Sequence, residues 1–144
     1  MDVKVKKPDG TWQSLVGPPG ASTPAMVSLG GFLTLTNVGA NYDTTPASKG
    51  LGIASIDFTN CTQIDFIVNV NKVGSGTQSW QLWNVTDGVE VVVINDAAGT
   101  GDKVLSVVKT TSLPTGVKTV RVRVKSTTAA DDPVYYGSTI KVTY

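Results

Sequence analysis

The residue types best suited to binding chemistry lie in the segment 79–84, Ser-Trp-Gln-Leu-Trp-Asn. Alternate side chains of an extended strand point to opposite faces, so Trp80 and Leu82 share one face. Gln81 and Trp83 share the other. An exposed indole beside amide groups can stack on a sugar ring while the amides bind its hydroxyls. We therefore predict that one tryptophan is buried. Trp83 is either a sugar-binding residue or a contact at a sheet edge or subunit boundary.

Two further groups of side chains are candidates for surface contacts. Tyr135 and Tyr136, like Trp83, are candidates for stacking on a sugar ring or for another surface contact. In segment 119–125, valines alternate with Arg121, Arg123 and Lys125, which predicts an apolar inner face and a basic outer stripe. The stripe is either solvated and salt-bridged, or it contacts an anion or a capsid.

Catalytic chemistry has little support. The chain contains no histidine, which removes the commonest general base and metal ligand and excludes a Ser-His-Asp or Cys-His arrangement. The acidic residues near strand ends form no pair with assignable roles: Asp57, Asp65, Asp87 and Glu90. The loop 96–102 lacks the alternating acidic ligands of a calcium loop. We therefore expect no catalytic residues, no cofactor, no metal and no enzymatic activity.

Size and composition predict one globular domain with a short arm. The chain has 144 residues, of which 40% are hydrophobic and 16% charged, and its formal net charge is +1. Because no charge excess favours nucleic acid, we predict no nucleic-acid partner. No apolar run approaches the roughly 20 residues of a membrane span, and the N-terminus lacks a signal-peptide pattern, so synthesis in a cytoplasm without membrane insertion is expected.

The sequence from about residue 27 onward has the period-two pattern of β-strands and almost no helical periodicity. The turn 86–88, Thr-Asp-Gly, stands between alternating apolar runs and predicts a β-hairpin. The predicted strands are 27–37, 51–58, 63–72, 78–85, 89–95, 103–110, 118–126 and 135–144. Strands at this spacing predict an all-β fold, an antiparallel β-sandwich or jelly roll.

The first 16 residues predict a basic arm or small hairpin that anchors the chain to a partner. Lysines alternate with valines, a Pro-Asp-Gly turn follows, and apolar residues come after it. This segment is too short to bury its tryptophan by itself. The candidate anchoring residues are Lys4, Lys6, Lys7, Trp12, Leu15 and Val16.

A collagen-type segment separates this arm from the β-rich sequence. Gly17, Pro18, Pro19 and Gly20 keep the period of three that collagen requires, and Thr23 ends it. The segment is therefore either an extended Pro-rich linker or a short junction at which three chains converge. A junction of three chains would make the protein a homotrimer.

A basic arm with an indole, followed by Gly-Pro-Pro-Gly, resembles the N-terminal ends of tailed-phage virion proteins, both head-decoration or head-fibre proteins and tail-fibre-like proteins. The resemblance covers about residues 1–26. It implies an anchoring arm over 1–26, a projecting sandwich over 27–144, and a non-enzymatic role on the virion surface, bound to the major capsid protein or another virion protein. The alternative is a tail-fibre module that binds a host receptor or surface glycan. A hydrolytic fibre domain is a third possibility.

Overall fold

A computed structural model of the chain describes residues 4–6, 12–14, 25–31, 33–35, 38–42, 51–128 and 131–144. These residues form strands and turns without a helix. The strands are β1 (Lys4–Lys6), β2 (Trp12–Ser14), β3 (Ala25–Leu29), β4 (Leu33–Thr34), β5 (Ile53–Asp57), β6 (Gln63–Lys72), β7 (Gln78–Asn84), β8 (Val89–Asp96), β9 (Gly101–Lys109), β10 (Val117–Ser126) and β11 (Val134–Thr143).

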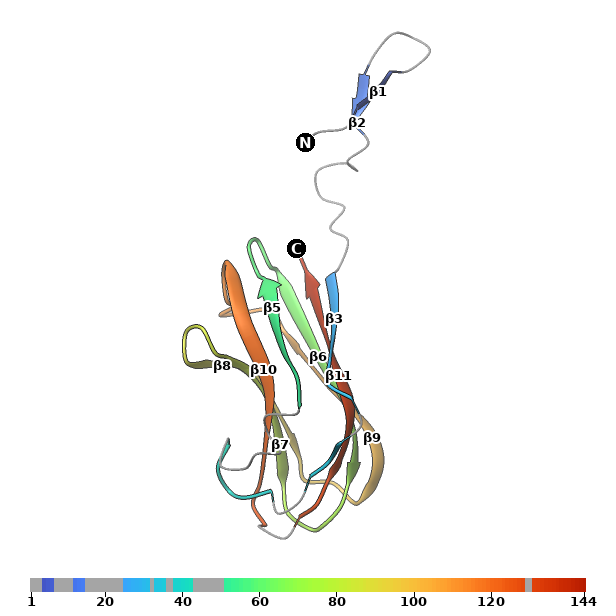
Figure 1. The fold of residues 1–144 in the computed structure, drawn as a ribbon, viewed down its shortest axis with the longest axis vertical. Coiled ribbons are helices and arrows are strands. Elements are labelled where there is room, and N and C mark those ends of the chain that lie inside the picture. The colour runs from blue at the N-terminus through green and yellow to red at the C-terminus, as the bar shows by residue number, and fades with distance from the viewer. Residues whose placement is uncertain are drawn as a thin grey trace.

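Two antiparallel sheets lie face to face and form a β-sandwich (Figure 1). The β10 sheet has the strand order β5-β10-β7-β8. The β6 sheet has the order β3-β11-β6-β9, and β4 also pairs with β11. The predicted all-β sandwich is confirmed. The sandwich includes Ala25 and Met26, which were predicted to belong to the arm, because β3 pairs with β11 from Ala25 onward.

The strand predictions hold best where alternation is regular. Strand β6 matches the predicted range 63–72, and β7 and β8 form the predicted hairpin. In the turn of this hairpin, Gly88 has a φ of 68°, and the N–H of Gly88 donates to the carbonyl of Asn84 over 3.0 Å. The predicted strand 27–37 is instead divided into β3 and β4. Gly30 lies between them with a φ of 71°, and a Cβ there would lie 2.7 Å from the carbonyl oxygen of Leu51.

The core lies between the two sheets and is built from their inward-facing residues. Along β6, every second side chain is buried, and in β10 the valines at 120, 122 and 124 face inward. Trp80 of β7 is fully buried and stacks on Tyr135 of β11, with ring centroids 5.9 Å apart and an interplanar angle of 18°. This aromatic pair joins the two sheets and contributes about 1 kcal/mol beyond its area burial.

Two β-bulges change which side chains face the core. Between β11 and β6 the register shifts at Tyr135 and Gly137, so Tyr136 is the extra residue. Gly137 has a φ of 126°, a conformation that glycine adopts far more readily than other residues. Between β7 and β8 the register shifts after Leu82, and Val91 is the extra residue.

Tyr135 links three parts of the sandwich through its hydroxyl group. The hydroxyl lies 2.8 Å from the carbonyl oxygens of both Leu29 and Leu51 and 2.9 Å from Oγ of Ser138. Burial raises the pKa of Tyr135 to about 12. The prediction that Tyr135 contacts a ligand at the surface is therefore wrong: the bulge turns its ring into the core, where it is fully buried.

Candidate functional site

The predicted binding residues of β7 and β10 meet on the outer face of the β10 sheet. Antiparallel pairing places Gln81 opposite Arg123 and Trp83 opposite Arg121. Residues that face each other across a sheet share a side of it, so these four side chains lie on the face away from the core. The predicted basic stripe therefore exists, but its members are not freely solvated: Arg121 is half-buried and Arg123 is buried.

Arg123 is the centre of a polar–aromatic cluster on this face. Its Nε donates to Oε1 of Gln81 over 2.8 Å, and its Nη2 donates to the same oxygen. The guanidinium carbon lies 3.7 Å from the centroid of the Trp83 ring and 5.0 Å from that of Tyr42. Each cation–π contact of this kind contributes about 1–2 kcal/mol when partly desolvated.

Glu90 and Lys125 complete the cluster. The amide of Gln81 donates to Oε2 of Glu90 over 2.6 Å, and Nζ of Lys125 lies 4.7 Å from the centroid of Tyr42. The bulge at Val91 makes the first bond possible, because it places Glu90 opposite Trp83 on the outer face. The ordinary pKa of a tyrosine is 10.0 and partial burial raises that of Tyr42 further, so its ring is neutral at neutral pH.

This arrangement corrects the predicted glycan site. Gln81 is buried, with 3% of its surface exposed, and both ends of its amide are already bonded within the protein. One face of the Trp83 ring is covered by Arg123. The cluster therefore ties β7, β8 and β10 to Tyr42, and it leaves no free amide on Gln81 beside the Trp83 ring, which the predicted sugar site requires.

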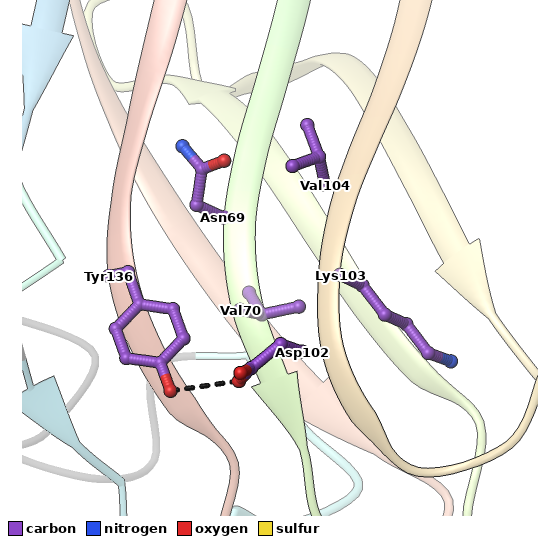
Figure 2. A pocket seen from close by; sticks show the side chains of 6 residues that line it. All are labelled: Asn69, Val70, Asp102, Lys103, Val104 and Tyr136. Atoms are coloured by element: carbon purple, nitrogen blue, oxygen red, sulfur yellow. Dashed lines mark hydrogen bonds between the residues drawn. The ribbon is translucent and has the colours of Figure 1, made fainter.

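Tyr136 lies at a different place, on the outer face of the β6 sheet. It is 42% exposed and borders an open hollow of about 330 Å³. The lining residues are Asn69, Val70, Asp102, Lys103, Val104 and Tyr136. Figure 2 shows Tyr136 directed toward Asp102, to which its hydroxyl donates over 3.0 Å. This hydrogen bond to a carboxylate raises the pKa of Tyr136.

The three aromatic residues that were predicted to stack on a sugar are thus not brought together. Trp83 is on the outside of the β10 sheet, whereas Tyr136 is on the outside of the β6 sheet, and Tyr135 is between them in the core. The opposite orientations of Tyr135 and Tyr136 follow from the Tyr-Tyr-Gly bulge. Its signal in the sequence is a glycine directly after two large residues in a strand.

The N-terminal hairpin holds three of the predicted anchoring residues. The strands β1 and β2 are antiparallel, with Lys4 opposite Ser14, Val5 opposite Gln13 and Lys6 opposite Trp12. Facing positions and every second position along a strand share a side, so the register assigns positions 4, 6 and 12 to one face. The other predicted anchors, Lys7, Leu15 and Val16, lie outside the described residues, as does the predicted trimer junction, Gly17, Pro18, Pro19 and Gly20.

Within the described residues, no group of three or more acidic, cysteine or histidine side chains is placed to hold a metal ion. The same ranges contain no helix of the length and hydropathy needed to cross a bilayer.

Known structures with a similar fold exist, but no family is identified for the chain. No protein-family model matches the chain, and no curated protein matches it in sequence. The fold is similar to a chain in the structure of infectious bursal disease virus strain Gx, with a TM-score of 0.52, 13% identity, and coverage of 99% of this chain and 37% of that one. VP2 in a subviral particle of the same virus gives a TM-score of 0.50 and 9% identity, again over 99% of this chain and 37% of the other.

A pilus subunit from Bacillus endospore appendages gives a TM-score of 0.41 with 18% identity, over 86% of this chain and 91% of that one. In the two comparisons with viral chains, this chain spans 37% of the length of the viral chain. At these identities the similarity shows the fold alone, an all-β sandwich of a kind that occurs in virus particles.

Proposed function

We propose that the chain is a non-enzymatic structural protein of a phage particle, a capsid-decoration or head-fibre protein. The arm, residues 1–26, binds the major capsid protein or another virion protein, and the sandwich projects from the particle surface. The protein is made in the host cytoplasm and acts on the virion as a homotrimer. The similarity of the sandwich to VP2 supports a structural role, and the two-part organisation of the chain supports anchoring.

The observation that carries this proposal is the separate hairpin at the N-terminus. Among the described strands, β1 and β2 pair only with each other. An isolated two-stranded hairpin is marginally stable in water, so a partner surface is needed to hold it. Its register puts two lysine positions and the tryptophan position on one face, a combination suited to an acidic surface with an apolar pocket.

The test is binding to particles that lack the protein, measured by co-sedimentation. Deletion of residues 1–16 is expected to leave a folded sandwich that no longer sediments with the particles. Trp12→Ala is expected to weaken binding at least tenfold, because a buried indole is a typical anchor of an interface. Gln13→Ala is the matched control, since position 13 lies on the opposite face of the hairpin. Full binding by the deletion variant would refute anchoring through the arm.

The alternative, a tail-fibre module that binds a receptor or glycan, loses its predicted site. Gln81 is bonded internally and Tyr135 is buried, while the two remaining aromatic residues, Trp83 and Tyr136, lie on opposite outer faces. No single described surface combines them.

A further inference from the structure

The outer face of the β6 sheet carries exposed apolar side chains at both of its edges. Met26 of β3 is 69% exposed, and Val104 and Val108 of β9 are 71% and 59% exposed. The register places Met26 opposite Lys141, Lys141 opposite Asp65, and Asp65 opposite Val108. One row across the sheet therefore begins and ends with an exposed apolar residue.

The middle of this row is polar but internally paired. Nζ of Lys141 lies 3.8 Å from Oδ2 of Asp65, and the other oxygen of Asp65 accepts a hydrogen bond from the amide of Gln63 over 2.6 Å. A partner that covers this row does not leave an isolated charge without a partner, which is the usual cost of burying a charged surface. The row is suited to protein contact along its whole width.

The chain enters the sandwich beside this row. Ala25, the first residue of β3, lies opposite Val142 near the end of β11, and Met26 follows directly. Gly20 is five residues before Ala25, and at most about 3.6 Å per residue separates them along the chain, so about 18 Å is the maximum distance. If three chains converge at residues 17–20, the first residue of each β3 strand therefore lies within about 18 Å of the convergence point.

A three-fold axis at this place determines which edges meet. In a closed ring of three identical subunits, one edge of a subunit contacts the opposite edge of the next one. The edges of the β6 sheet are β3 and β9, and among the described strands neither has a neighbour on its outer side. An unpaired strand edge of this kind can pair with another chain.

We propose that this protein forms its trimer through the outer face of the β6 sheet, with Met26 of one copy packed against Val108 of the next. The inference rests on the trimer of the proposed function and names the surface that makes it. Val104 extends the same contact along β9, toward the hollow beside Tyr136 (Figure 2).

The outer face of the β10 sheet differs in a way that makes it a control. Ile53 and Val117 are 61% and 62% exposed, comparable with Met26 and Val108. The row of Ile53 runs through Arg121 and Trp83 and ends at Glu90 of the other edge strand, β8, whereas Val93 of β8 lies in a different row. The β10 sheet therefore lacks an apolar pair at opposite edges of one row.

The test is the solution mass of the full chain, measured by light scattering at several concentrations. The wild-type protein is expected at about three times 15.0 kDa. Met26→Lys and Val108→Glu are each expected to reduce the mass to that of one chain, whereas Ile53→Lys keeps the trimer. Circular dichroism and thermal melting check that each variant folds, which is expected because all three positions are exposed.

The double variant Met26→Lys with Val108→Glu gives the sharpest result. The two positions in one copy are three strand spacings apart, about 14 Å, which is too far for a direct ion pair. Between copies the new lysine meets the new glutamate, so the double variant is expected to regain the trimer. If both single variants still form trimers, the proposed contact face is wrong, although the trimer itself stands. A wild-type monomer at every concentration would overturn both, while co-sedimentation with particles tests anchoring separately.

Discussion

Replacing Tyr135 with phenylalanine removes one hydroxyl from the centre of the sandwich and leaves the aromatic ring in place. That hydroxyl lies 2.8 Å from two buried carbonyl oxygens, those of Leu29 and Leu51. Leaving a buried acceptor without its donor costs about 1–3 kcal/mol. We therefore expect Tyr135→Phe to lower the free energy of unfolding by about 2 kcal/mol, which corresponds to about 8 °C in melting temperature for a domain of this size.

The neighbouring residue provides a matched control. Tyr136 also donates its hydroxyl to an acceptor, Asp102, but it is 42% exposed. Water replaces a lost surface hydrogen bond, so Tyr136→Phe is expected to change stability by less than about 0.5 kcal/mol. Urea unfolding followed by tryptophan fluorescence measures both variants. Equal effects of the two substitutions would refute the assignment of Tyr135 as the buried link.

The same residue predicts a pH dependence with a defined sign. The pKa of Tyr135 is raised from 10.0 to about 12 in the folded protein, so the unfolded chain releases the phenol proton first as pH rises. The contribution of Tyr135 to the free energy of unfolding is fully present below pH 10 and is lost as the pH rises from 10 to 12. With about 1.4 kcal/mol per pKa unit, the loss is about 2–3 kcal/mol. The stability gap between the wild-type protein and Tyr135→Phe is expected to close over this range, and a constant gap would contradict the argument.

Two further substitutions test the cluster and the bulge. Arg123→Met removes the cation from the Trp83 ring and leaves a buried Gln81 oxygen without its donor, so we expect a loss of about 2–3 kcal/mol in urea unfolding. Lys125→Met, at the half-buried edge of the cluster, is expected to cost less than about 1 kcal/mol, and an equal loss would argue against a central role for Arg123. Gly137→Ala places a side chain at a φ of 126° and is expected to lower stability by about 1–3 kcal/mol. Gly99→Ala, in open space, serves as its control in the same thermal melts, and similar effects would show that the bulge is not strained by a side chain.

The class of fold could be predicted from the sequence because it depends on local patterns. The regular alternation of β6 specifies both a strand and its buried face without reference to any partner. The Asp87-Gly88 turn specifies the β7–β8 hairpin in the same way, because its glycine supplies the required positive φ. The inward valines of β10 were also predicted by alternation alone.

The candidate site could be predicted only in part. Alternation placed Trp83 and Gln81 on the outer face, and the structure agrees. It did not show that Gln81 is buried there. The covering groups come from β8, β10 and residues 38–42, and their approach depends on strand order, which alternation does not contain.

The two bulges are the features that alternation along the chain could not predict. Counting back by twos from buried Ile140 would place Tyr136 inside, and counting back from Ile94 would place Glu90 inside. A bulge in each strand reverses this assignment, so Tyr135 enters the core and Glu90 reaches Gln81. Local sequence patterns predict most of the strands, the β7–β8 turn and the sandwich, because those depend on neighbouring residues. The strand order, the bulges and the surface left for a partner depend on pairing between distant segments, and only the folded chain specifies them.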